Sequence, residues 1–184
     1  KNKHNICLIT VLHGLEVTRL ESKKYSKRIK NFIQTIRNSN HVIAVSDYTK
    51  NKAELISGNS LIETIPNFVD PEKFFLLNQK QSREQFGFKE SDKILLTLSR
   101  LVKRKGHEIV INALSLIVKT IPNIKYVIAG SGEKRYEEYL KRLVSRLELD
   151  NNVLFLGYID EEKKNDLYNA CDIYIMNSHK TNDQ

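Results

Sequence analysis

The chain has 184 residues, of which 30 are Lys or Arg and 22 are Asp or Glu, so its formal net charge is +8 with neutral histidines. Hydrophobic residues make up 40% of it, which excludes collagen-like, low-complexity and disordered chains. Cys7 and Cys171 lie in apolar runs without metal-ligand spacing, which predicts two buried thiols in a reducing compartment. No apolar run reaches the roughly 18 residues needed to cross a bilayer.

The first third of the chain predicts short strands separated by two helices. An apolar run at residues 6–12 precedes apolar side chains at three- and four-residue spacing over residues 23–37, a pattern typical of an amphipathic helix. The β-branched run 41–45 ends at Ser46, which we expect to cap a second helix that Gly58 terminates. Residues 61–65 predict the next strand. Weak periodicity over residues 66–91 places a domain connection near the start of that segment, giving domains 1–68 and 69–184.

The second part of the chain alternates regularly between strands and helices. Strands are expected at 93–98, 124–129, 153–156 and 172–176. The helices between them should bury apolar faces, listed in chain order as Val110, Ala113, Leu114 and Ile117, and then Tyr136, Leu140, Leu143, Val144 and Leu147. Continuous apolar strands that alternate with helices are typical of a parallel sheet covered on both faces. The predicted fold class is therefore α/β, doubly wound.

A basic loop follows the first of these strands. Residues 99–106 read S-R-L-V-K-R-K-G and place four cations between a strand end and a helix start. Ligands of such sheets bind beyond the carboxyl ends of the strands, and backbone N–H groups at a helix start favour an anion. A phosphate site and a solvated basic turn are equally compatible with this loop.

Two further loops follow strands in the same way. Gly130-Ser131-Gly132 would let a ligand approach the backbone, or would simply make a tight turn. The dinucleotide fingerprint is absent because Arg135 occupies the position of its third glycine. Residues 157–160 would offer backbone groups to a nucleotide base, and a turn explains them equally well.

Six segments occur in an order that is more specific than any one of them. They are 11–14 (V-L-H-G), 42–46 (V-I-A-V-S), 65–70 (I-P-N-F-V-D), 96–107 (L-T-L-S-R-L-V-K-R-K-G-H), 128–132 (I-A-G-S-G) and 155–159 (F-L-G-Y-I). In this order and spacing they resemble family 4 retaining glycosyltransferases of the GT-B fold, whose donor motif is G-R-L-x-x-x-K-G. Ser99 replaces the usual glycine of that motif, and Phe68 replaces the glycine of the usual P-N-G.

The resemblance covers nearly the whole chain and implies Rossmann-like parallel-sheet domains of the GT-B type. It also implies the middle of a longer enzyme, because the family's glycine-rich first loop would precede Lys1 and its paired-glutamate motif would follow Gln184. Residues 1–68 would then be the C-terminal part of the acceptor-side domain. Residues 69–184 would be most of the nucleotide-sugar donor domain, incomplete at its C-terminus.

The activity that the resemblance implies is transfer of a sugar from a nucleotide diphosphate to an acceptor, with retention of the anomeric configuration. Arg100 and Lys105 would hold the donor diphosphate and stabilise the charge that it gains as the glycosidic bond breaks. His13 would lie near the transferred sugar, with Gly14 leaving it room. The alternative for His13 is a hydrogen-bonded histidine at a strand end.

The remaining donor contacts follow from the same resemblance. Gly130 and Gly132 would line the donor cleft, and the backbone of Ile159 would contact the base. Ser46 and Asn67 are weaker candidates, because helix capping explains the first and the turn between domains explains the second. No essential metal or other cofactor is implied, and the sequence contains no Asp-x-Asp motif.

The partners implied are a nucleotide-sugar donor and a glycan or lipid-linked acceptor, such as a glycolipid or a cell-surface polysaccharide precursor. The expected location is the cytoplasm, with peripheral contact on the inner face of the membrane. The basic helix 23–37 would rest on anionic lipid, or it would face the core with a basic solvent side. Nucleic-acid binding is the alternative from another class, and no aromatic-basic interleaving or helix-turn-helix pattern favours it. A nucleotide-binding module without catalysis is a third interpretation.

Overall fold

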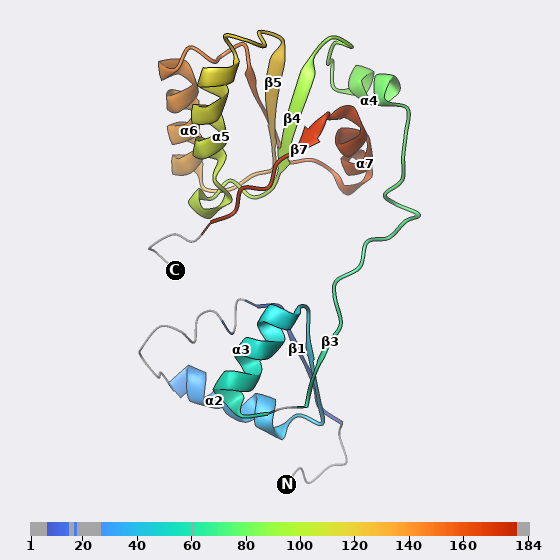
Figure 1. The fold of residues 1–184 in the computed structure, drawn as a ribbon, viewed down its shortest axis with the longest axis vertical. Coiled ribbons are helices and arrows are strands. Elements are labelled where there is room, and N and C mark those ends of the chain that lie inside the picture. Colours follow the sequence, from blue (N-terminus) through green and yellow to red (C-terminus); the bar gives the residue numbers. More distant parts are fainter. Residues whose placement is uncertain (1–6, 15–16, 18–26, 60, 180–184) are drawn as a thin grey trace. The chain divides into compact units, whose positions relative to one another are not determined.

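The computed structural model describes residues 7–14, 17, 27–59 and 61–179. The chain divides into two compact units, Lys1–Val69 and Asp70–Gln184 (Figure 1). Each unit has its own parallel sheet, with three strands in the first and four in the second. The α/β class and the Rossmann-like parallel sheets predicted from the sequence are confirmed.

Unit 1 is a sheet in the order β1-β2-β3 with two helices. Its elements are β1 (Ile9–Leu12), α2 (Lys27–Asn38), β2 (His41–Ala44), α3 (Asp47–Ser57) and β3 (Ile62–Thr64). Leu12 on β1 is buried in the core of this unit, whereas Ile9 and Val11 point to the opposite face and are about half exposed. The strand therefore buries one of its two faces among the described residues.

Helix α2 turns its apolar stripe toward the core of unit 1. Ile36 is fully buried and Phe32 packs against the same cluster. This packing supports the core-facing interpretation of the basic helix, whose expected first residues, 23–26, lie outside the described residues. Among the residues that the structure describes, no helix is long and apolar enough to span a membrane.

Helix α3 begins and ends where the sequence predicts. The Ser46 hydroxyl accepts a hydrogen bond from the Thr49 backbone N–H at 3.2 Å, which satisfies one of the free donors at the helix start. Gly58 ends the helix in the left-handed conformation, with φ of 68°, and its N–H bonds to the Glu54 carbonyl. Capping therefore accounts for Ser46.

Unit 2 is a parallel sheet in the order β6-β5-β4-β7. Its elements are α4 (Gln79–Gln85), β4 (Lys93–Leu98), the 3-10 turn η2 (Lys103–Lys105), α5 (His107–Ile117), β5 (Ile124–Ala129), α6 (Lys134–Arg146), β6 (Val153–Gly157), α7 (Glu161–Ala170) and β7 (Ile173–Tyr174). Helices α5 and α6 lie on one face of the sheet, and α4 and α7 lie on the other (Figure 1). The sheet is thus covered on both faces, as the continuous apolar strands predict.

The face that α5 buries differs from the prediction. Val110 and Leu114 are buried as expected, but Ala113 and Ile117 are exposed, and Ile111 is fully buried instead. His107 at the start of the helix completes the buried face at i, i+3, i+4 and i+7. A predominantly apolar helix gives no polar contrast from which to choose a face, so the prediction was wrong for Ala113 and Ile117.

Helix α4 was not predicted, and a buried arginine holds it in place. Arg83 is 5% exposed; its Nε donates to the Ala170 carbonyl at 3.0 Å and its guanidinium pairs with Asp172 at 2.8 Å. The same Asp172 carboxylate accepts the Ile94 N–H at 2.7 Å. The arginine therefore ties α4 to the amino-terminal ends of β4 and β7, opposite the loops of interest.

The expectation of two buried thiols was wrong for one of them. Cys7 is exposed, because β1 begins only at Ile9 and Cys7 precedes the paired part of the strand. Cys171 is half-buried between α7 and β7, and burial raises the pKa of its thiol. Neither cysteine is in a disulfide.

Candidate functional site

The loops singled out from the sequence meet at one edge of unit 2. All four strands are parallel, so their carboxyl ends lie at the same edge. The loops that leave this edge are residues 99–106 after β4, 130–133 after β5, 158–160 after β6 and 175–179 after β7. The Gly130 N–H donates to the Gly157 carbonyl at 2.6 Å and so ties the loop after β5 to the carboxyl end of β6.

The basic loop 99–106 leads directly into α5. Gly106 is in the left-handed conformation, with φ of 70°, and serves both as the end of η2 and as the N-cap of α5. Arg100 is exposed and Lys105 is half-buried. Burial lowers the pKa of Lys105, and the charges of Arg104 and Arg100 lower it further. Cations that repel one another at a helix start form a site that an anion would stabilise.

Loop 130–133 is packed directly against the backbone of the basic loop. Leu101 and Gly132 form an isolated parallel bridge, in which the Leu101 N–H donates to the Ser131 carbonyl at 3.1 Å and the Glu133 N–H donates to the Leu101 carbonyl at 3.2 Å. A Cβ atom at Gly130 would overlap the Ser99 carbonyl, and one at Gly132 would overlap that of Leu101. Both glycines therefore allow two loops of the site to touch.

A third segment, residues 175–179, crosses the basic loop after β7 (Figure 1). Its start is fixed by a buried chain in which the Tyr126 hydroxyl donates to Thr97, and the Thr97 hydroxyl donates to the Ile175 carbonyl, each at 2.9 Å. Its end is fixed where the His179 N–H donates to the Arg104 carbonyl at 2.9 Å. The basic loop is thus held from two sides.

Gly106 permits that crossing. A Cβ atom at this position would overlap the backbone carbonyl of Asn177. From the sequence a strand was expected at residues 172–176, whereas β7 covers Ile173–Tyr174, and the contact of the following residues with the basic loop was not predicted. The glycine at position 106 was the one available signal, because a close approach of backbone requires it.

His107, which follows Gly106, was given no role from the sequence. It is the first residue of α5, it is fully buried, and its Nε2 lies 3.2 Å from the Ser99 hydroxyl. Burial, together with the charge of Lys105, lowers its pKa to about 4. Its Nδ1 is buried without a hydrogen-bond partner. A histidine that follows Lys-Gly gives no periodic or compositional signal of such a contact.

Ile159 lies in the loop between β6 and α7. Its side chain is buried in the core cluster beneath α4 and α7, which fixes the backbone of the loop. Gly157 ends β6 with φ of 69° and directs the chain out of the sheet. The structure thus brings the predicted base-contact loop to the same sheet edge as Arg100 and Lys105.

His13 and Gly14 lie in unit 1, at the carboxyl end of β1. His13 is exposed, and Gly14 has φ of 103°, in the left-handed region. A Cβ atom at Gly14 would come 3.3 Å from the Thr49 hydroxyl in the first turn of α3. The structure therefore places these two candidates in one unit, and Arg100, Lys105, Gly130, Gly132 and Ile159 in the other.

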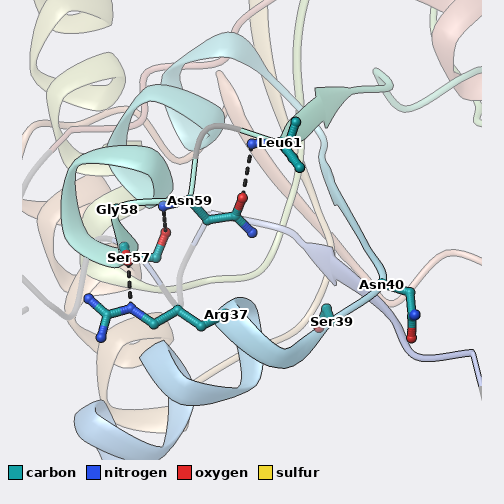
Figure 2. Close-up of a pocket in the computed structure, with 7 residues that line it drawn as sticks. All are labelled: Arg37, Ser39, Asn40, Ser57, Gly58, Asn59 and Leu61. Atoms are coloured by element: carbon teal, nitrogen blue, oxygen red, sulfur yellow. Dashed lines mark hydrogen bonds between the residues drawn. The ribbon is translucent and has the colours of Figure 1, made fainter.

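A cavity of about 510 Å³ in unit 1 contains none of the predicted residues (Figure 2). It is lined by Arg37, Ser39, Asn40, Ser57, Gly58, Asn59 and Leu61. These residues come from the ends of α2 and α3 and from the connections that lead into β2 and β3, at the amino-terminal side of the sheet. The Arg37 Nε donates to the Ser57 carbonyl at 2.7 Å and so joins the two helix ends.

Within residues 7–14, 17, 27–59 and 61–179, no group of three or more His, Cys, Asp or Glu side chains could hold a metal ion. The charged groups at the candidate site in unit 2 are mainly cations. They are suited to hold an anionic ligand directly.

Two family profiles match successive parts of the chain. "Glycosyltransferase Family 4" matches residues 1–73, and "Glycosyl transferases group 1" matches residues 78–182. The N-acetyl-alpha-D-glucosaminyl L-malate synthase of Bacillus anthracis is 31% identical over 95% of this chain and 44% of its own length. A GDP-mannose-dependent monoacylated alpha-(1-6)-phosphatidylinositol monomannoside mannosyltransferase of Corynebacterium glutamicum is 30% identical over 72% of this chain and 35% of its own length.

Solved structures of similar fold include the Anabaena HepE protein in complex with UDP and glucose. It superposes with a TM-score of 0.75 and 25% identity over 93% of this chain and 46% of its own. WaaG, a glycosyltransferase involved in lipopolysaccharide biosynthesis, shares the fold with a TM-score of 0.74 at 16% identity, over 94% of this chain and 50% of its own. The chain thus spans less than half the length of the curated relatives described here.

Proposed function

We propose a function in sugar transfer for this chain, which belongs to the glycosyl transferases of group 1 and to glycosyltransferase family 4. In this proposal the chain contributes to the transfer of a sugar from a nucleotide-diphosphate donor to an acceptor, with retention of the anomeric configuration. One observation carries the proposal. The basic loop, the glycine loop and the base-contact loop of the family's donor motifs meet at one sheet edge, where cations surround a helix start.

In this proposal the chain's cations hold the leaving group. Arg100 can donate two hydrogen bonds to phosphate oxygens, and Lys105 supplies a second, mobile positive charge. The diphosphate gains negative charge as the glycosidic bond breaks, so these contacts strengthen in the transition state and accelerate the reaction. Because side chains supply this charge, we propose that no metal ion is essential.

The other site residues have supporting roles in the same proposal. Gly130 and Gly132 line the donor cleft next to the basic loop, and the backbone of Ile159 contacts the base. His13 lies near the transferred sugar in the complete enzyme, with Gly14 leaving it room.

The proposed acceptor is a glycolipid or a cell-surface polysaccharide precursor. The names of two relatives support this class, since one acts on a phosphatidylinositol monomannoside and another is an alpha-monoglucosyldiacylglycerol synthase. A lipid-linked acceptor would bring the protein to the inner face of the membrane from the cytoplasm. The exposed Lys27 and Lys30 of α2 could then contact anionic lipid while the apolar side chains of the helix stay packed in the core of unit 1.

The test is a thermal-shift panel of UDP, GDP and ADP, each with and without EDTA, and with a short single-stranded oligonucleotide as the charge control. A nucleotide at about 100 times its dissociation constant stabilises the chain by roughly 2.7 kcal/mol, which raises the midpoint by several degrees. We expect one nucleotide to dominate, and EDTA to leave its shift unchanged.

Arg100→Ala should then weaken binding of that nucleotide about 100-fold and leave the unliganded midpoint unchanged, because the side chain is exposed. Lys103→Ala, in the same loop, is the matched control and should have less than a threefold effect. Unchanged affinity in Arg100→Ala and Lys105→Ala would reject the diphosphate assignment. A shift given by the oligonucleotide alone, and abolished by salt, would instead favour nucleic-acid binding.

A further inference from the structure

His107 and Ser99 close the basic loop into a ring. Ser99 is its first residue, His107 follows its last, and their side chains meet at 3.2 Å. Arg100 and Lys105 both lie within the segment that this contact closes. The contact is therefore positioned to set the shape of the loop rather than to bind a ligand itself.

The chemistry of the histidine defines the direction of this hydrogen bond. His107 is fully buried next to the Lys105 ammonium and the start of α5, which favour its neutral form. A neutral imidazole carries one proton, and a buried N–H without an acceptor is less tolerable than a buried lone pair without a donor. Because Nδ1 has no partner, the proton belongs on Nε2, and Nε2–H donates to the Ser99 hydroxyl.

The serine can then act on the next peptide. When the Ser99 oxygen accepts from His107, its own proton is left to donate, and the Arg100 carbonyl oxygen lies 3.4 Å away. The Val102 N–H also donates to the Arg100 carbonyl at 3.0 Å, so the Ser99 hydroxyl is its second donor, and the loop is held at other points as well. The backbone bridge to Gly132 holds its beginning, and the His179 N–H holds the Arg104 carbonyl near its end.

We propose that His107 is a positioning residue for the donor diphosphate: through Ser99 it holds the backbone of Arg100 in the conformation in which the guanidinium meets the phosphates. The proposal rests on the proposed function, because it assigns a role within that same site. It also gives a role to Ser99, whose side chain makes both of these hydrogen bonds.

A purely structural histidine would behave differently from a positioning one. His107→Phe keeps a ring of similar size, removes the unpartnered Nδ1 and leaves the half-buried Ser99 hydroxyl to solvent. Because the Ser99 hydroxyl can bond to solvent and Nδ1 has no partner to lose, this replacement leaves no buried polar group newly unsatisfied, and we expect it to be neutral or stabilising for the fold. If His107 positions Arg100, His107→Phe should lower the affinity for the nucleotide while the free energy of unfolding stays the same or rises.

The experiment measures the affinity of UDP, GDP and ADP by calorimetry at pH 7.5 for wild type, Ser99→Ala, His107→Phe and the double variant. Urea unfolding of the same proteins is measured in parallel. We expect each single variant to weaken binding of the nucleotide that wild type binds by about tenfold. The stability of His107→Phe should be unchanged or higher, whereas Ser99→Ala leaves the buried Nε2–H of His107 without an acceptor and should also lose stability. The double variant should lose no more than either single one, because both remove the same contact. His107→Gln, which offers an N–H near the position of Nε2, should recover most of the affinity.

Full affinity in both single variants would overturn the proposal, and so would a loss of affinity in His107→Phe that accompanies a fall in its stability. Arg100→Ala separates this failure from that of the proposed function. If Arg100→Ala loses affinity while Ser99→Ala and His107→Phe do not, only the positioning role is rejected. If wild type binds none of UDP, GDP and ADP, the donor site is rejected and the positioning role with it.

Discussion

The two units each carry candidate residues at the carboxyl end of a parallel strand, but they hold them in different ways. In unit 2 the basic loop is bonded through its backbone to residues 131–133 and to His179, and it is closed by His107. In unit 1 His13 is exposed after β1, and a Cβ atom at Gly14 would come 3.3 Å from the Thr49 hydroxyl of α3. Within the described residues, the first site is an interlocked set of loops and the second is a strand end.

The proposed function would place different demands on the two sites. A diphosphate carries several charges, and binding it without reorganisation requires donors that are fixed before the ligand arrives. Interlocked loops supply that rigidity. A residue that contacts only the transferred sugar needs a position on a strand end and room around it, which a glycine provides.

Gly130→Ala is the substitution that we expect to disrupt the contact between the two interlocked loops most strongly. Its Cβ would overlap the Ser99 carbonyl, and φ of 123° is a conformation that side chains rarely adopt. We expect the free energy of unfolding to fall by about 3 kcal/mol, from overpacking together with backbone strain. Urea unfolding followed by tyrosine fluorescence measures this loss.

Gly87→Ala is the matched control within unit 2. Gly87 has φ of 70°, but nothing lies within 4 Å of the Cβ that it would gain. It should lose only about 1 kcal/mol, the strain of a left-handed alanine. Equal losses in the two variants would show that backbone conformation, and not loop contact, explains Gly130.

Elements with a local pattern were predicted from the sequence. The alternation of apolar runs with helical spacing predicted β4, β5 and β6, and Ser46 and Gly58 predicted both ends of α3. The three donor loops of the candidate site were located because each follows such a strand. Parallel strands carry the loops that follow them to one edge, so their convergence follows from fold class alone.

What was missed depends on contacts between distant residues. Arg83 holds α4 in place by bonding to Ala170 and Asp172, which lie more than 80 positions along the chain. The sequence around α4 therefore gives no indication of these contacts. Residues 175–179 are held by Thr97 and Arg104 in the same way. His107 was missed for another reason, because its burial depends on which face α5 turns to the core.

A smaller effect is expected on the pH dependence of the free energy of unfolding, through His107 in unit 2. The pKa of His107 in the folded chain is about 4, below the ordinary value of 6.5, because of burial and the nearby Lys105. The unfolded chain therefore takes up a proton more readily. The stability that neutral His107 contributes is complete above pH 6.5 and is lost as the pH falls toward 4. At pH 5 we expect a loss of about 2 kcal/mol relative to pH 8.

The His107→Phe variant isolates that loss from other groups that titrate in the same range. Its stability should fall less than that of wild type between pH 8 and pH 5, by the same amount of about 2 kcal/mol. The charge of Lys105 acts on His107, and the Tyr136 ring packs against it. Neither group titrates between pH 5 and pH 8, because Lys105 stays charged and burial raises the pKa of Tyr136 to about 12. Parallel pH profiles for the two proteins would contradict this assignment.

The smallest expected effect is that of His13→Ala, and it tests the other half of the comparison. His13 is exposed at the end of β1, so its removal should change the free energy of unfolding by less than about 0.5 kcal/mol. The affinity of this chain for the nucleotide selected in the thermal-shift panel should change less than twofold, because the proposed diphosphate contacts all lie in unit 2. Calorimetry against Arg100→Ala checks this. A loss of nucleotide affinity as large as that of Arg100→Ala would show that the single strand end of unit 1 also helps to hold the nucleotide.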